Sequence, residues 1–181
     1  MAFKYKLENR DGAHDLATDL VDLGYREFAV LAGPSDLVTA SVRTEGFEAG
    51  LADCGIELGV GRLVHGEFTR DGGYAAAGEV LRSMPGVEAI FAVNDVMAVG
   101  AMARLREAGL SLPGDIAIAG FDDIATLRDV TPALTTVQLP LERVGRDALD
   151  LALAERSDGP VTERIAGRVV IRQSTPRIGD A

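Results

Sequence analysis

Short apolar segments alternate with segments of helical period along most of this chain. The apolar runs carry no polar residue at alternate positions and lie at residues 28–31, 89–93 and 116–119. Such runs are typical of strands buried on both faces, as in a parallel sheet covered by helices. A weaker strand is predicted at residues 62–64.

The segments between the strands place apolar residues three or four positions apart, as amphipathic helices do. One stripe runs from residue 13 to 21 before Gly24, and another from 97 to 108 before Gly109. Glycine commonly follows a helix end, so both helices are expected to stop there. Two more helices are predicted, at residues 38–52 and 73–81. Repeated strand–helix alternation predicts right-handed βαβ units in a doubly wound α/β fold with a parallel sheet.

The alternation changes after Gly120. A polar loop is predicted at residues 122–135, followed by a short strand at 136–138. A helix at 141–154 follows, with one apolar face: Leu141, Val144, Ala148 and Leu151. Two more strands are predicted near residues 161–165 and at 168–171.

Composition narrows the function classes. The 181 residues, 47% of them hydrophobic, suffice for one medium domain. The formal net charge of −10 repels phosphate backbones, so we expect no direct grip on DNA. The first residues are too charged for a secretory signal, and no apolar run approaches the roughly 20 residues that cross a bilayer. We therefore expect a cytoplasmic protein without membrane contact.

Catalytic, metal and cofactor motifs are missing from the sequence. Cys54 is the single cysteine, and His14 and His65 do not give zinc-ligand spacing or a Cys-His dyad. There is no phosphate loop, no His-Glu-x-x-His and no Gly-x-Ser-x-Gly elbow. Gly59-Val60-Gly61 lacks the third glycine of a dinucleotide fingerprint and precedes a strand. We expect no enzyme activity, no catalytic residue, no cofactor and no metal.

Polar side chains follow three of the predicted strands, at the sheet edge where ligands of such folds bind. Asn94 and Asp95 follow the run at 89–93, Asp122 and Asp123 follow the run at 116–119, and Arg43 lies in the helix after the run at 28–31. Amide, carboxylate and guanidinium groups can each make paired hydrogen bonds to adjacent sugar hydroxyls.

Phe68 adds an aromatic ring for the C–H face of a sugar or the plane of a base.

Structural roles are the alternative for each of these residues. Asn94 or Asp95 can cap the following helix, and for Asp95 capping is favoured over ligand binding. Asp122 and Asp123 can be turn formers. Arg43 can be a solvated helix residue, and Phe68 a core aromatic.

A set of short stretches occurs in a fixed order along nearly the whole chain. They are Asn9-Arg10-Asp11-Gly12-Ala13, Leu23-Gly24-Tyr25-Arg26, Leu31-Ala32-Gly33-Pro34, Arg43-Thr44-Glu45-Gly46-Phe47, Ala89-Ile90-Phe91-Ala92-Val93-Asn94-Asp95, Leu112-Pro113-Gly114-Asp115-Ile116, Gly120-Phe121-Asp122-Asp123 and Thr131-Pro132-Ala133-Leu134-Thr135-Thr136-Val137. In this order they resemble the effector domain of the LacI/GalR-type transcription regulators. That domain is similar in turn to periplasmic sugar-binding proteins.

The resemblance assigns roles to particular residues. Arg43 corresponds to an effector-contacting arginine, Asn94 to a hydroxyl-binding asparagine and Asp122 to an effector-binding aspartate. Phe68 lies where family members often place an aromatic ring against the ligand. Leu139 and Leu141 fall where some members supply polar or aromatic contacts, so their apolar character leaves a sugar and a purine both open as the ligand.

The resemblance also implies the domain organisation. It predicts one lobe of a type I periplasmic-binding-protein-like domain over residues 9–139 plus 168–176. Residues 140–167 would be a helix and strand of a second lobe, and the helix-turn-helix DNA-binding domain would be absent. The apolar face of the 141–154 helix would then fold back, exchange between chains or form a dimer.

The implied function is that of an effector sensor in a bacterial repressor. A small sugar or purine would bind between two lobes of a homodimer, and operator DNA would be contacted only through the absent headpiece. Two other classes stay open: a stand-alone periplasmic-type sugar-binding or purine-binding protein, and a sugar-metabolising enzyme. The missing export signal weighs against the first, and the missing catalytic motif weighs against the second.

Overall fold

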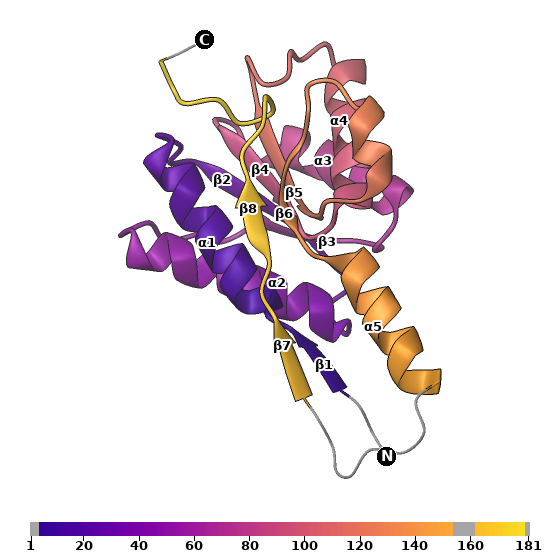
Figure 1. The fold of residues 1–181 in the computed structure, drawn as a ribbon. Coiled ribbons are helices and arrows are strands. Elements are labelled where there is room, and N and C mark those ends of the chain that lie inside the picture. The colour runs from indigo at the N-terminus through magenta and orange to yellow at the C-terminus, as the bar shows by residue number, and fades with distance from the viewer. Residues whose placement is uncertain (1–3, 154–161, 180–181) are drawn as a thin grey trace.

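The fold is built around a six-stranded, mostly parallel sheet with the strand order β3-β2-β4-β5-β6-β8 (Figure 1). The computed structural model describes residues 4–153 and 162–179. Strand β8 alone runs antiparallel, beside β6. The sheet strands are β2 (Phe28–Gly33), β3 (Leu63–His65), β4 (Ala89–Ala92), β5 (Ala117–Asp122), β6 (Thr135–Gln138) and β8 (Arg168–Val170). The predicted doubly wound α/β fold is confirmed.

Helices cover both faces of this sheet. Helices α1 (Asn9–Asp22) and α2 (Val38–Asp53) pack together on one face, while α3 (Arg70–Ser83) and α4 (Asp95–Glu107) pack together on the other (Figure 1). The core lies between sheet and helices, where Phe47 stacks on Phe91 with ring centroids 4.5 Å apart. As predicted, the continuously apolar strands β2 and β4 are buried on both faces.

The helices of each pair approach closely at glycines. A Cβ atom on Gly100 of α4 would lie 1.8 Å from the carbonyl oxygen of Arg70. A Cβ on Gly46 of α2 would lie 2.2 Å from the carbonyl oxygen of Arg10. Only a residue without a side chain fits at such contacts between two backbones.

Two elements differ from the predicted pattern. Strand β5 runs to Asp122, past the predicted end at residue 119, because its backbone ladder with β6 continues to the pair Asp122–Gln138. The predicted polar loop contains a 3₁₀ helix, η1 (Ala125–Asp129), in which Leu127 is buried. The apolar pattern alone did not predict either, since Gly120 interrupts the run and one apolar residue gives no helical period.

A second unit extends from one end of the six-stranded sheet. Strand β1 (Lys4–Leu7) pairs in parallel with β7 (Thr162–Ile165), and helix α5 (Leu141–Leu153) projects from the same end (Figure 1). Residues 154 and 161, at the predicted ends of the helix and strand, lie outside the described residues, as does the side chain of Leu151. On the predicted apolar face of α5, Leu141 and Ala148 are exposed and Val144 is partly buried, so the described part of this face is largely open to solvent. The division into lobes stays a prediction.

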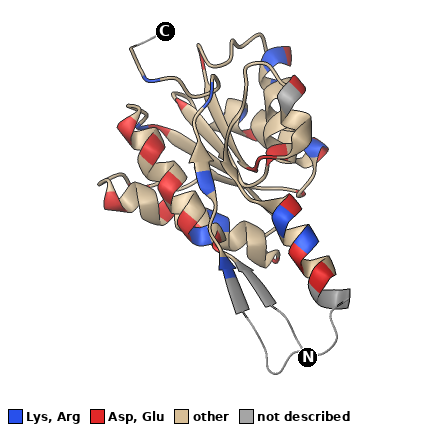
Figure 2. Cartoon of the chain, in the orientation of Figure 1, with Lys and Arg blue, Asp and Glu red and all other residues tan. Residues whose placement is uncertain are grey.

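The excess of acidic residues in the sequence is visible on the helices. Acidic side chains occur along α1 and α2, and both signs of charge occur on α5 (Figure 2). Among the described residues, no helix is long and apolar enough to cross a membrane.

Candidate functional site

Arg43 joins four elements at the carboxyl edge of the sheet. Its Nε donates to Asn9 Oδ1 at the start of α1 (3.0 Å), and its Nη1 donates to the carbonyl oxygen of Val93 just after β4 (2.8 Å). Its Nη2 donates to Asp122 Oδ1 at the end of β5 (2.7 Å), and its guanidinium carbon lies 3.9 Å from the ring centroid of Phe121. Arg43 is only 3% exposed, so the alternative of a solvated helix residue is wrong.

Asp122 is the more accessible partner of this ion pair. Its side chain is 20% exposed, and no described group bonds to Oδ2. Burial raises the pKa of Asp122 above its ordinary value, while the charge and hydrogen bond of Arg43 act to lower that pKa. A carboxylate that is half satisfied by a fixed arginine keeps acceptor capacity for a ligand.

Asn94 and Phe68 lie together beside this pair. Asn94 is 2% exposed, its Oδ1 accepts from the backbone N–H of Met97 (2.7 Å), and its Nδ2 donates to the carbonyl oxygen of Phe68 (3.4 Å). Asn94 is therefore the N-cap of α4, as the structural alternative predicted. The Phe68 ring is half-buried over Gly33. Both residues lie at the carboxyl edge of the sheet, where Arg43 of α2 meets Asp122 at the end of β5.

Asp95 does not cap α4, which corrects our sequence interpretation. It is fully buried, and its Oδ1 accepts from Thr136 Oγ1 (2.7 Å) while its Oδ2 accepts from the backbone N–H of Ile124 (3.0 Å). An acidic residue after a buried strand fits a cap locally, but the preceding Asn94 takes that role. The partners of Asp95 come from β6 and from the segment after β5, which no local pattern links to it.

Burial gives Asp95 an unusual titration. The pKa of Asp95 is raised from 3.8 to about 7, mainly because burial removes water from the carboxylate. The charge of Asp122 also acts to raise this pKa, and hydrogen bonds from Thr136, Ile124 and Asp123 act to lower it. No ion pair to Asp95 occurs among the described side chains, since Arg43 faces Asp122 and Arg172 faces Asp123.

Asp95 should make the folded state less stable as pH rises. Between about pH 4 and about pH 7 the native carboxyl stays protonated while the unfolded one ionises, so the native state binds more protons and the free energy of unfolding falls. We expect a loss on the order of a few kcal/mol across that range, which Asp95→Asn removes. Urea unfolding of both proteins at pH 5, 6, 7 and 8 measures this difference. Parallel pH profiles would contradict the prediction.

Asp123 points away from its neighbour Asp122, as expected for adjacent residues at a strand end. It accepts from Gln138 Nε2 (2.6 Å) and pairs with Arg172 Nη1 (2.8 Å). The alternative that these aspartates form the turn also holds, since Asp122 and Asp123 have φ values of 115° and 57°. Sequence reasoning missed these partners, and Asn9 with them, because they are far apart along the chain.

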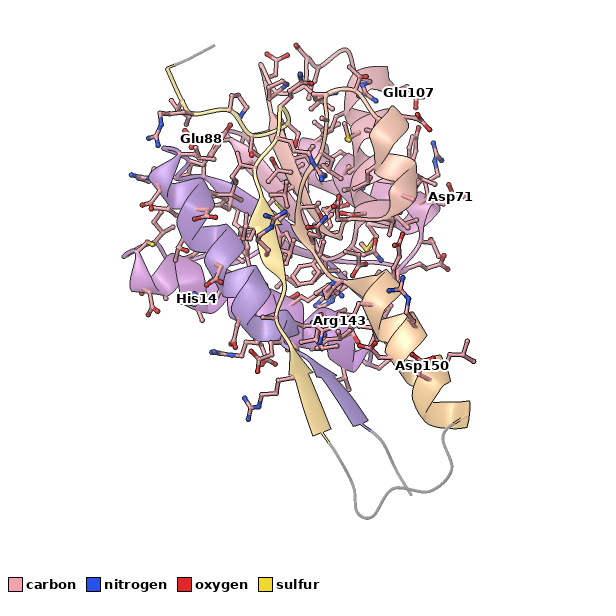
Figure 3. All side chains as sticks on the ribbon, in the orientation of Figure 1. His14, Asp71, Glu88, Glu107, Arg143 and Asp150 are labelled. Carbon is pink, nitrogen blue, oxygen red and sulfur yellow. The ribbon has the colours of Figure 1, made fainter. Side chains whose placement is uncertain are left out.

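A cavity lies beside the candidate site, but the candidate ligand-binding residues do not line it. This cavity of about 920 Å³ is bounded by the segment after β5, by residues 138–143 and by β8. Arg143 of α5 (Figure 3) and Arg168 of β8 both line it, as do Leu139 and Leu141. Arg43, Asn94, Asp122 and Phe68 do not line it. The described part of the chain holds no cluster of three metal-binding side chains.

Comparisons with known proteins identify the family to which this fold belongs. The profile of the family described as "Periplasmic binding protein-like domain" matches residues 17–175. The chain is 35% identical over 159 residues to the "HTH-type transcriptional regulator CelR" of Thermobifida fusca, covering 88% of this chain and 46% of that protein. It is 38% identical over 140 residues to the ribose operon repressor of Escherichia coli strain K12, covering 77% and 42% respectively. The chain thus spans less than half the length of these curated relatives.

Solved structures give the same result. The complex of the transcriptional regulator CelR with cellobiose superposes with a TM-score of 0.87 at 31% identity, covering 96% of this chain and 54% of that one. A LacI family regulator from Enterococcus faecium with bound ribose gives a TM-score of 0.85 at 27% identity, covering 98% and 66%. These relatives are named as transcription regulators and repressors, not as enzymes. The chain belongs to the periplasmic binding protein-like family, as an effector-binding domain of the LacI-type transcription regulators.

Proposed function

We propose that this chain is the effector-sensing part of a transcription repressor and binds a small sugar-like molecule through Asp122, Arg43, Asn94 and Phe68. The observation that carries the proposal is the buried Arg43–Asp122 pair, in which Asp122 Oδ2 keeps its acceptor capacity at the carboxyl edge of the sheet. Two adjacent ligand hydroxyls can donate to such a carboxylate.

The ligand class follows from the character of these groups. Vicinal hydroxyls suit the carboxylate of Asp122, and the ring of Phe68 suits the C–H face of a sugar. A purine is the second candidate, because a planar base can stack on the same ring. The relatives include a ribose operon repressor from Escherichia coli and a transcriptional repressor named PurR from Proteus mirabilis.

The sensing mechanism we propose needs two lobes. Residues 9–139 plus 168–176 form one lobe, residues 140–167 contribute to the other, and the effector binds between them. An effector changes operator affinity only as far as it binds one lobe arrangement more tightly than the other. We infer a cytoplasmic homodimer that contacts DNA through a separate headpiece, since the net charge of −10 disfavours contact through this domain.

Calorimetric titration of the full-length regulator that carries this domain tests the proposal. We expect one of ribose, cellobiose and hypoxanthine to bind, and Asp122→Asn to weaken that binding by about 30-fold or more, the range for a lost charged hydrogen bond. Asp15→Asn, in an exposed acid of α1, serves as the matched control and should bind as the parent does. Equal binding by the Asp122 and Asp15 variants would overturn the site assignment, and a panel without any binder would overturn the ligand class.

A further inference from the structure

The backbone that presents Asp122 adopts a conformation that side chains disfavour. Asp122 and Asp123 have φ values of 115° and 57°, in the left-handed region that favours glycine and that side chains other than those of asparagine and aspartate seldom enter. Two consecutive residues of this kind persist only where the surrounding structure holds them. The direction of the Asp122 carboxylate therefore depends on whatever fixes the backbone at residues 122–124.

The buried side chain of Asp95 holds this backbone segment in place. Its carboxylate accepts the backbone N–H of Ile124 at 3.0 Å and also bonds to the backbone of Asp123, the two residues directly after Asp122. Its other oxygen accepts the hydroxyl of Thr136 on β6 at 2.7 Å. The carboxylate thus ties the end of β5 to the neighbouring strand and to the start of α4.

The surroundings are shaped around this carboxylate. A Cβ atom on Gly120 would lie 2.4 Å from Asp95 Oδ1, so glycine at this point of β5 lets the carboxylate reach Thr136. When it is ionised, the Asp95 carboxylate offers only acceptors to the three donors that converge on its two oxygens. Asparagine has the same shape, but it would turn an NH₂ group toward one of these donors.

We propose that Asp95 is a positioning residue for effector recognition: it fixes the backbone of residues 122–124 so that the Asp122 carboxylate faces both Arg43 and the ligand. This inference rests on the proposed function, because it assigns to Asp122 the ligand contact described above. Asp95 is fully buried and does not touch the effector itself. It therefore acts through the geometry of Asp122.

A double-mutant cycle in the full-length regulator tests this role, with ribose, cellobiose and hypoxanthine as probes. We expect Asp95→Asn to weaken binding about 10-fold in the parent but to add almost nothing in the Asp122→Asn background, because both changes disable the same contact. Equal losses in both backgrounds, or no loss in the parent, would overturn the positioning role. If Asp122→Asn itself leaves binding unchanged, the proposed function fails instead.

Thr135→Val is the matched control. Thr135 is buried next to Thr136 but bonds to Thr175 and to the backbone of Arg172, on the side away from Asp95. This variant should lower the melting temperature without lowering affinity, whereas Thr136→Val should lower affinity. An affinity loss from Thr135→Val as large as that from Thr136→Val would contradict the inference.

Amide hydrogen exchange provides a readout that needs no ligand. In Asp95→Asn the protection of the Ile124 amide should fall at least 10-fold, while the amide of Ala119 in the middle of β5 keeps its protection. Unchanged protection at Ile124 would show that Asp95 does not hold this backbone.

Discussion

Replacing Gly100 with alanine should lower the free energy of unfolding by about 3 kcal/mol, the upper end of the usual cost of overpacking. The added Cβ would lie 1.8 Å from the carbonyl oxygen of Arg70 in the neighbouring helix. A second glycine, Gly73 of α3, meets α4 in the same way, with a Cβ position 2.1 Å from the carbonyl oxygen of Met97. Both obstructing atoms are backbone, so a whole helix must move to relieve the contact.

Urea unfolding of Gly100→Ala and of Gly145→Ala gives the comparison. Gly145 lies in α5 with nothing within 4 Å of an added Cβ, so alanine there should stabilise the protein by about 0.5–1 kcal/mol through helix propensity. Equal changes in the free energy of unfolding for the two variants would contradict the prediction, because they would show that the close packing of α3 on α4 does not cause the loss in Gly100→Ala.

Asp122→Ala should also lower the free energy of unfolding by about 3 kcal/mol, because it leaves the charge of Arg43 unpaired at a site that is 3% exposed. The bonds from Arg43 to Asn9 and Val93 remain, which places the expected cost at the low end for a broken buried pair. Removing the charge as well, in Arg43→Met/Asp122→Ala, should recover part of the loss, since methionine can pack its side chain against Phe121.

A double-mutant cycle by chemical unfolding measures the coupling free energy between Arg43 and Asp122. Asp71→Ala is the control: Asp71 pairs with Arg70, but their side chains are 85% and 53% exposed (Figure 3). Its loss should change stability by less than about 0.5 kcal/mol. A double variant that is less stable than Asp122→Ala would contradict the proposed penalty of an unpaired Arg43.

Local pattern was sufficient for most of the fold. Strands such as β4 are buried on both faces, which produces an uninterrupted apolar run, and the helices keep their apolar period because only one face meets the sheet. The strand-end pattern named Arg43 and Asp122 as two of several candidates, and the family resemblance assigned each an effector contact, but neither predicted their ion pair.

Roles that depend on contacts across the chain were not predictable from local pattern. Asp95 was assigned a cap because its neighbours in sequence suit one, whereas its actual partner Thr136 is 41 residues away. The links from Arg43 to Asn9 and from Asp123 to Arg172 are of the same kind. Such contacts are set by the order of strands in the sheet, which apolar periodicity does not encode.

Strand β8 has a consequence for how the chain folds as it is made. It covers the open side of β6, and the residues that follow it complete the core, where Ser174 donates to the carbonyl oxygen of Ile118 at 2.6 Å. Helix α5 and strand β7, which are not part of this sheet, come between β6 and β8 in the sequence. During synthesis the edge of β6 therefore stays unpaired while these elements emerge from the ribosome. An exposed strand edge is a template for wrong pairing, so the nascent chain is open to mispairing along β6 during this interval.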